Sequence, residues 1–246
     1  MILLFKLLLA HLIGDFILQP RSWVDKKETL KLKAWQFYAH VLIHGFLIML
    51  LVSDWNFILP AFIITVLHGI IDGLKINFQR VRSGLIGWFL MDQFLHIIVI
   101  FTVWVWWTEI DMLTLFPYPS LHFFVLVTAL VFLTTPTSVL IKILISHWTP
   151  GKTGPADSLP DAGKIIGILE RMFILVFVLS NHWEVIGFLL AGKSIFRFGD
   201  LKEAHDRKLT EYVLIGTLLS FGMAILVGLA LMQFFGTAPS VLNLKS

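Results

Sequence analysis

The sequence contains no cysteine, which excludes a disulfide framework and any thiolate metal site. Charged residues are also scarce: they make up 14% of the chain, whereas a soluble domain carries about 25%. Hydrophobic residues account for 57%, and the mean hydropathy is +0.86. Several apolar runs approach the roughly 20 residues that a helix needs to cross a bilayer. This composition predicts an all-α, polytopic membrane protein that folds as a helix bundle.

The net charge is only +3, and the basic residues gather between the apolar runs. We interpret this distribution as a signal of membrane topology, and we expect no nucleic-acid partner. The 20–34 segment, expected to be a loop, holds five basic residues, and Arg80 and Arg82 lie in the predicted 77–84 loop. By the positive-inside rule, both segments are cytoplasmic and the N-terminus lies outside.

Apolar length and periodicity predict helices at 2–19, 35–53, 57–76, 85–107 and 119–146, with a kink at Pro136 in the fifth. A last helix is expected at 211–235. The sequence between them fits either one crossing or two short helices, at 161–180 and 184–199, broken at "SNHWE". The two-helix reading returns the next basic residues to the cytoplasm, so we prefer it, although a re-entrant hairpin is also possible. The chain then has seven or eight membrane segments.

We expect two parts along the chain. Residues 1–107 form a core of four helices, and residues 108–246 add the kinked helix, a cytoplasmic loop rich in Gly and Pro, and the possible short hairpin. In the first part, each helix carries one pair of polar residues at i, i+4, which places both side chains on one helical face. The pairs are His11–Asp15, His40–His44, His68–Asp72 and Asp92–His96.

The alternating direction of the four helices sorts these eight groups into two layers in the cytoplasmic half of the membrane. The layer nearer the cytoplasm holds Asp15, His40, Asp72 and Asp92, and the deeper layer holds His11, His44, His68 and His96. The first pair maps onto the third, 57 residues later, which suggests duplicated hairpins forming one four-helix core.

Four-helix bundles build metal sites from side chains on facing helices, and all eight groups are candidate ligands. The nitrogen and oxygen donors suit one or two ions of Zn, Fe, Mn or Ni. A proton or ion relay and a structural hydrogen-bond network remain open as alternatives. Paired histidines on facing helices could also bind haem, but the aspartates beside them fit a haem site poorly. Gln93 and Gln19 are candidate donors to the ligands.

A second group of charged residues lies in the predicted helices of the C-terminal part. Glu170 and Arg171 either pair with Lys193, Arg197 or Glu211, or extend to the membrane surface. Arg171, Lys193 and Arg197 are therefore also candidate contacts for an anionic substrate.

The motifs "LLLAHLIGDFILQP", "HVLIH", "LHGIIDGLK" and "DQFLHI" resemble those of a bacterial membrane family, domain of unknown function 3307. The resemblance covers about the first 107 residues, and it implies a multi-pass protein of the bacterial cytoplasmic membrane. The family has no established activity to carry over. A more distant likeness is to membrane-bound metal-dependent hydrolases, which also bear His/Asp pairs on helices.

These observations lead to three functional hypotheses. The first is a metal-dependent hydrolase acting on a lipid or phosphoester at the cytoplasmic side. In this hypothesis the four deep histidines are ligands; Asp15, Asp72 and Asp92 act as ligands, bridges or general bases; and His40 ligates or shuttles a proton. The second is a transporter of metal ions or protons, which the apolar outer halves of the helices disfavour. The third is a structural membrane subunit.

Overall fold

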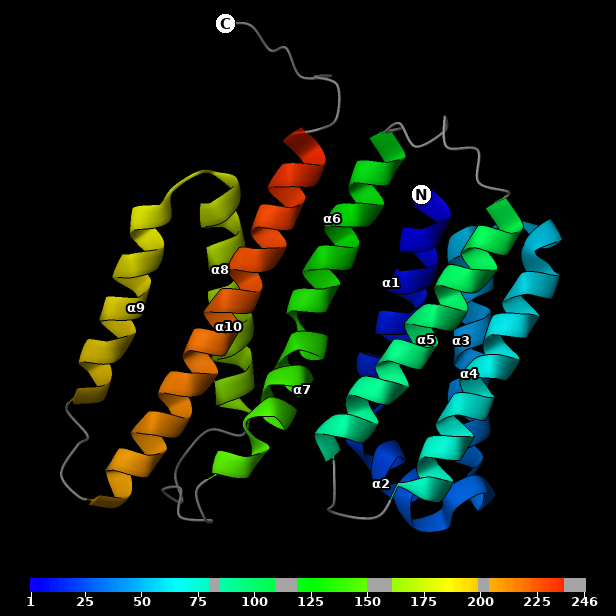
Figure 1. Ribbon diagram of the computed structural model, residues 1–246, viewed down its shortest axis with the longest axis horizontal. Coiled ribbons are helices and arrows are strands. Elements are labelled where there is room, and N and C mark those ends of the chain that lie inside the picture. Colours follow the sequence, from blue (N-terminus) through cyan, green and yellow to red (C-terminus); the bar gives the residue numbers. More distant parts are fainter. Residues whose placement is uncertain (80–84, 109–118, 150–160, 199–203, 237–246) are drawn as a thin grey trace, which may run out of the picture. The chain divides into compact units, whose positions relative to one another are not determined.

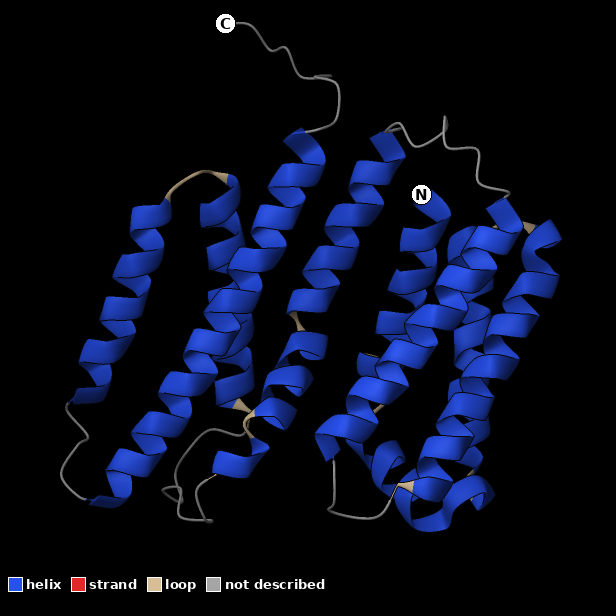
Figure 2. Cartoon of the chain, in the orientation of Figure 1, coloured by secondary structure: helices blue, strands red, loops and turns tan. Residues whose placement is uncertain are grey.

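The computed structural model describes residues 1–79, 85–108, 119–149, 161–198 and 204–236. Within these ranges the chain forms helices and no strands (Figure 2), which confirms the all-α prediction. The chain divides into two compact units, Met1–Val131 and Phe132–Ser246. We describe each unit separately.

The first unit is built mainly from four long helices, α1 (Ile2–Phe16), α3 (Trp35–Val52), α4 (Ile58–Phe78) and α5 (Leu85–Thr108). Each packs against the next, and α1 also packs against α5 (Figure 1). Their bounds agree with the predicted helices to within three residues. A short 3-10 turn, η2 (Trp55–Phe57), precedes α4, and the first part of α6 (Pro119–Leu133) completes this unit.

An apolar core holds the four helices together at the end that contains the N-terminus. Leu7, Ile48, Phe57, Ile64 and Ile100 are among its buried members. Removing apolar surface from water contributes about 25 cal/mol per Å² in soluble proteins, but inside a bilayer the main gain comes from close packing.

The outward faces of the same helices are apolar as well. Leu42, Phe46 and Phe62 are between 65% and 70% exposed, as expected where lipid replaces water around a helix. In the described ranges, four helical stretches are long and apolar enough to cross a membrane: Trp35–Val52, Trp55–Phe78, Leu85–Thr108 and Lys208–Gly236. The number rises to six if each bent helix pair forms one span. The finer count of seven or eight segments, and the duplication within the core, remain predictions.

One prediction about the first unit is wrong. The 20–34 segment, expected to be a loop, forms a helix, α2 (Arg21–Leu30), followed by the 3-10 turn η1 (Lys31–Lys33). After Pro20, the chain turns by 76° from the direction of α1, so α2 lies across one end of the four helices (Figure 1). The segment has no apolar stripe to signal a helix. Tertiary contacts hold it instead: the ring centroids of Trp23 and Trp35 lie 5.3 Å apart.

The second unit contains α7 (Thr135–Leu144), η4 (Ser146–Trp148), α8 (Ala162–Leu179), α9 (Trp183–Phe198) and α10 (Ala204–Gly236). Helix α10 packs against α7 and α8, and α8 also packs against α9. The segment from 161 to 199 is thus two helices joined at Ser180–His182, as the preferred reading predicted. Helix α10 begins seven residues earlier than expected.

The break between α6 and α7 falls at Thr134, two residues before Pro136, which confirms the predicted interruption there. Proline lacks an N–H group, so a helix that contains it leaves carbonyl oxygens free. The carbonyl of Phe132, four residues before Pro136, accepts instead from the hydroxyl of Thr137 at 2.7 Å. The carbonyl of Thr134 accepts both from the backbone N–H of Ser138 at 3.2 Å and from its hydroxyl at 3.0 Å. A neighbouring threonine therefore meets the backbone carbonyl that the proline leaves free.

Candidate metal centre

Four imidazole rings, one from each of α1, α3, α4 and α5, meet inside the first unit. The ring of His68 lies 3.8 Å from that of His44 and 4.2 Å from that of His96, measured between centroids. His11 lies between 5.2 and 6.0 Å from the other three. All four histidines are buried, with at most 4% of each residue exposed. The structure thus brings together the four histidines that the sequence places at one depth.

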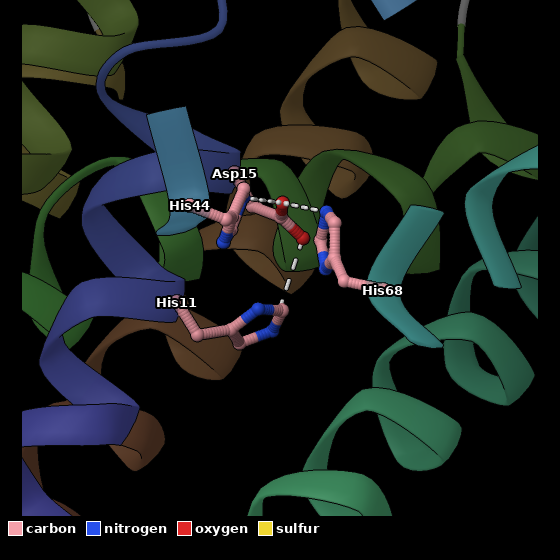
Figure 3. A group of neighbouring side chains, drawn as sticks. All are labelled: His11, Asp15, His44 and His68. Carbon is pink, nitrogen blue, oxygen red and sulfur yellow. Dashed lines mark hydrogen bonds and ion pairs between the residues drawn. The ribbon is translucent and has the colours of Figure 1, made fainter. Parts of the chain in front are cut away.

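The carboxylate of Asp15 lies among the histidine side chains (Figure 3). Its Oδ1 atom is 3.0 Å from Nε2 of His44, 3.3 Å from Nε2 of His40 and 3.7 Å from Nε2 of His68. Its Oδ2 atom is 3.8 Å from Nε2 of His11. One carboxylate therefore lies within 3.8 Å of the Nε2 atoms of four histidines.

A glycine on α1 allows this approach. A Cβ atom at Gly14 would lie 2.5 Å from both Cε1 and Nε2 of His44, well inside van der Waals contact. The ring of His44 thus crosses α1 directly over the backbone of Gly14, and there meets Asp15. The glycine between the two polar residues of "HLIGDF" was the sequence signal for this close approach. The sequence alone does not show that α3 is the element that approaches it.

In the imidazole of His96, one ring nitrogen forms a hydrogen bond and the other has no hydrogen-bond partner among the described residues. Its Nδ1–H donates to the carbonyl oxygen of Asp92 at 2.8 Å, which leaves the lone pair on Nε2. That buried Nε2 atom has no hydrogen-bond partner among the described residues. Histidines that bind metals commonly donate the other ring N–H to a carbonyl or carboxylate in this way, and the hydrogen bond fixes the ring and its tautomer.

Two lysines, which were not predicted as site residues, pair with the other two carboxylates of the cluster. Lys27, from α2, lies 3.0 Å from Oδ2 of Asp72, and Lys75, from α4, lies 2.8 Å from Oδ2 of Asp92. The spacing of Lys75 from Asp72 in "DGLK" places it on the same side of α4, a signal that was available. Nothing in the local sequence indicates that Lys27 would enter the site.

Gln93 connects the members of the cluster, as predicted. Its amide nitrogen donates to Asp15 at 3.1 Å and to Asp92 at 3.2 Å, and its oxygen lies 3.3 Å from Nε2 of His11. The side-chain nitrogen of Gln19, the other candidate donor, has no partner among the described residues.

A small cavity of about 10 Å³ adjoins the deep histidines. Its remaining walls are apolar, formed by Leu7, Ile48, Ile64, Val99 and Ile100. This volume is near the lower limit for one water molecule. The centre is therefore closed by hydrocarbon on the side of the apolar core, while its other side, toward α2, carries the carboxylates and lysines.

Among the residues that the structure describes, three overlapping sets of donors are close enough together to hold a metal ion. They are His11–Asp15–His44–His68, His40–His68–Asp72 and Asp72–Asp92–His96, with donor atoms within 4.8 Å of one another in each set. Two donors on a tetrahedral ion with bonds near 2.0–2.1 Å are about 3.3 Å apart. The three nitrogen-to-Asp15 distances in the first set, 3.0, 3.7 and 3.8 Å, bracket that value.

The candidate substrate-contacting residues lie in the second unit. Arg171 is 2% exposed, and its guanidinium donates to the carbonyls of Leu133 and Thr134 and to the hydroxyls of Ser138 and Ser220. Lys193 pairs with Glu170 at 2.7 Å, as predicted for this pair. The side chain of Arg197 lies outside the described residues.

Comparison with known proteins identifies one relationship. The model of a family described as "Protein of unknown function (DUF3307)" matches residues 3–121. The match confirms the resemblance predicted from the His/Asp motifs, and it extends beyond the predicted 107 residues. No curated protein and no solved structure matches the chain. The more distant likeness to membrane-bound hydrolases remains a prediction.

Proposed function

Residues 3–121 of this chain belong to a family of unknown function, and we propose from the site alone that the protein is an integral membrane, metal-dependent hydrolase. In this proposal a divalent transition metal, Zn, Fe or Mn, binds within the first unit. The substrate is a lipid or another phosphoester that reaches the centre from the cytoplasmic side.

The observation that carries the proposal is the free Nε2 atom of His96. A purely structural network should pair its buried polar atoms, because each unpaired one costs about 1–3 kcal/mol. Here a buried nitrogen with a fixed tautomer and an available lone pair lies beside three further imidazoles and a carboxylate. That donor set suits a borderline metal ion.

The residues of the chain divide into roles by their positions. His11, His44, His68 and Asp15 would hold the ion, with His96 as a further ligand. A bound divalent ion supplies Lewis acidity and lowers the pKa of a coordinated water toward about 7. His40 is placed to move a proton, because its Nε2 lies 3.3 Å from Asp15 and 3.5 Å from Asp72. Gln93 orients Asp15 and Asp92.

The apolar wall supports hydrolysis over transport. An ion leaving the centre toward the N-terminal end would have to pass Leu7, Ile48, Ile64 and Ile100, and these side chains provide no oxygen or nitrogen ligand. The polar side of the centre faces α2, a basic segment. We infer from the positive-inside rule that this end is cytoplasmic and that the N-terminus lies outside. The membrane we propose is the bacterial inner membrane.

Metal content tests the proposal. The protein is purified without chelator, supplied with Zn, Fe and Mn in turn, and analysed by mass spectrometry for metal per chain. The same measurement on His44→Ala/His68→Ala should show the metal lost, while the exposed His182→Ala serves as the matched control. Wild-type protein that binds no metal would overturn the proposal.

Activity separates the remaining hypotheses. Loaded protein is assayed against phosphodiester and carboxylic ester lipids in mixed micelles, and for ion uptake in proteoliposomes. Hydrolysis that disappears in the double variant supports the proposal. Metal binding with uptake and without hydrolysis would favour the transporter instead.

A further inference from the structure

The two lysines of the centre divide its carboxylates into two kinds. Asp72 and Asp92 each have an ammonium group within 3.0 Å. Asp15 has no lysine or arginine ion pair among the described residues, and its neighbours are histidines and Gln93. Of the three possible metal sets in the described part of the chain, therefore, only His11–Asp15–His44–His68 has a carboxylate without an ammonium partner.

The lysines come from different elements and approach from different sides. Lys27 extends from α2 into the bundle, and its side chain is 7% exposed. Lys75 lies on α4, and its side chain is 27% exposed. Lys31, one turn after Lys27, donates to the carbonyl of Ile76 at 2.7 Å and so fastens the end of α2 to α4. Lys27 is thereby held in place by the fold.

The net charge of the carboxylates and ammonium groups in the centre is balanced best by one divalent ion together with one anion. Three carboxylates and two ammonium groups sum to one negative charge when the histidines are neutral. One divalent ion makes the centre positive by one charge. Two divalent ions would make it positive by three, in a site walled by hydrocarbon, where uncompensated charge is costly.

We propose that the centre holds a single metal ion, and that the ammonium groups of Lys27 and Lys75 take the place of a second ion and bind the phosphoryl group of an anionic phosphoester. This inference rests on the proposed function. In two-metal phosphoesterases a second cation about 3.5–4 Å from the first stabilises the oxygens of the reacting phosphate. Lysine binds phosphate as a point charge, and Lys75 is exposed enough to be reached.

The unpaired Nε2 of His96, which also supports the proposed function, points to a ligand at this place. It is 2% exposed, adjoins the cavity, and belongs to the set that also contains Asp72 and Asp92. One oxygen of Asp72 and one of Asp92 pair with lysines, and the ring of His96 lies 4.2 Å from the ring of His68, a donor of the first set, measured between centroids.

Counting metal tests the first half of the inference. Wild-type protein saturated with zinc should hold one ion per chain, and Lys27→Met/Lys75→Met should hold two, since Asp72 and Asp92 become available. Lys26→Met, on the exposed side of α2, should hold one. Two ions in the wild type, or one in the double variant, would overturn the inference. No ion in any form would instead overturn the proposed function.

Phosphate binding tests the second half. Inorganic phosphate is titrated into zinc-loaded protein by calorimetry, with metal content measured on each sample. Lys75→Met should weaken binding about tenfold or more, the value of one hydrogen bond to a charged group. Lys75→Arg should keep most of the affinity and so separates charge loss from misfolding, and Lys26→Met should match the wild type. Equal affinity in Lys75→Met and wild type would refute an anion-binding role.

Discussion

Replacing Gly14 by alanine should separate metal affinity from fold stability. The added Cβ would lie 2.5 Å from Cε1 and Nε2 of His44 and 3.0 Å from Cδ2. Carbon atoms pack at about 3.5–4.0 Å, so the ring must retreat by about 1 Å. Metal–nitrogen bonds are about 2.0–2.1 Å long, so a ring displaced this far no longer coordinates the ion.

The expected loss of affinity follows from this displacement. Altering a residue that merely supports a ligand costs about 10–100-fold in metal affinity, so losing the ligand itself should cost at least that much. Stability should change far less. Overpacking costs about 1–3 kcal/mol, and alanine is about 1 kcal/mol better than glycine within a helix. The net destabilisation of the metal-free protein is therefore about 2 kcal/mol or less.

The assay is a competition titration of zinc against a fluorescent chelator, beside thermal unfolding of the metal-free form. Gly87→Ala on α5 is the matched control, because its Cβ would meet nothing within 4 Å. It should leave affinity unchanged and raise stability by up to about 1 kcal/mol. Gly14→Ala binding zinc as tightly as the wild type would refute the role given to His44.

Three further predictions concern stability. Metal at a hundred times its dissociation constant should stabilise the protein by about 2.7 kcal/mol over the chelator-treated form; identical unfolding curves would contradict a native-state site. Arg171→Met should destabilise by about 2–4 kcal/mol, because the carbonyl of Leu133 and the hydroxyl of Ser220 lose their hydrogen bonds with the buried guanidinium. Metal content should stay unchanged, and a joint loss of metal would argue against a purely structural role. Glu170→Gln should cost about 1 kcal/mol or less in thermal unfolding, since the pair with Lys193 is partly exposed; a larger loss would indicate a stronger pair than this exposure allows.

The long helices were predictable from the sequence, and so was the position of each polar pair on one face of its helix. Both depend only on local periodicity. An apolar run long enough to span a bilayer must close its backbone hydrogen bonds internally, so it forms a helix. Residues at i, i+4, such as His11 and Asp15, then share a face whatever the rest of the chain does. The break near Pro136 follows from the missing N–H of proline by the same kind of local argument.

Helix α2 and Lys27 were not predictable in this way. The 20–34 segment is polar and carries no stripe of apolar residues, so its sequence reads as a connection between two spans. Contacts with distant residues decide its form, including the pair of Lys27 with Asp72, 45 residues away. Propensity is a weak prior for so short a helix, and tertiary packing overrides it.

By itself the sequence determined that the protein is helical and strongly apolar, and that each of four helices presents two polar groups at similar depth. Tertiary structure decided which of these groups meet. In the folded bundle, Asp15 lies among four Nε2 atoms, and the ring of His44 passes over Gly14. Asp72 and Asp92 form ion pairs with lysines. Helical periodicity sets the direction of a side chain, but rotation and spacing between helices set its neighbours, and those depend on packing across the whole bundle.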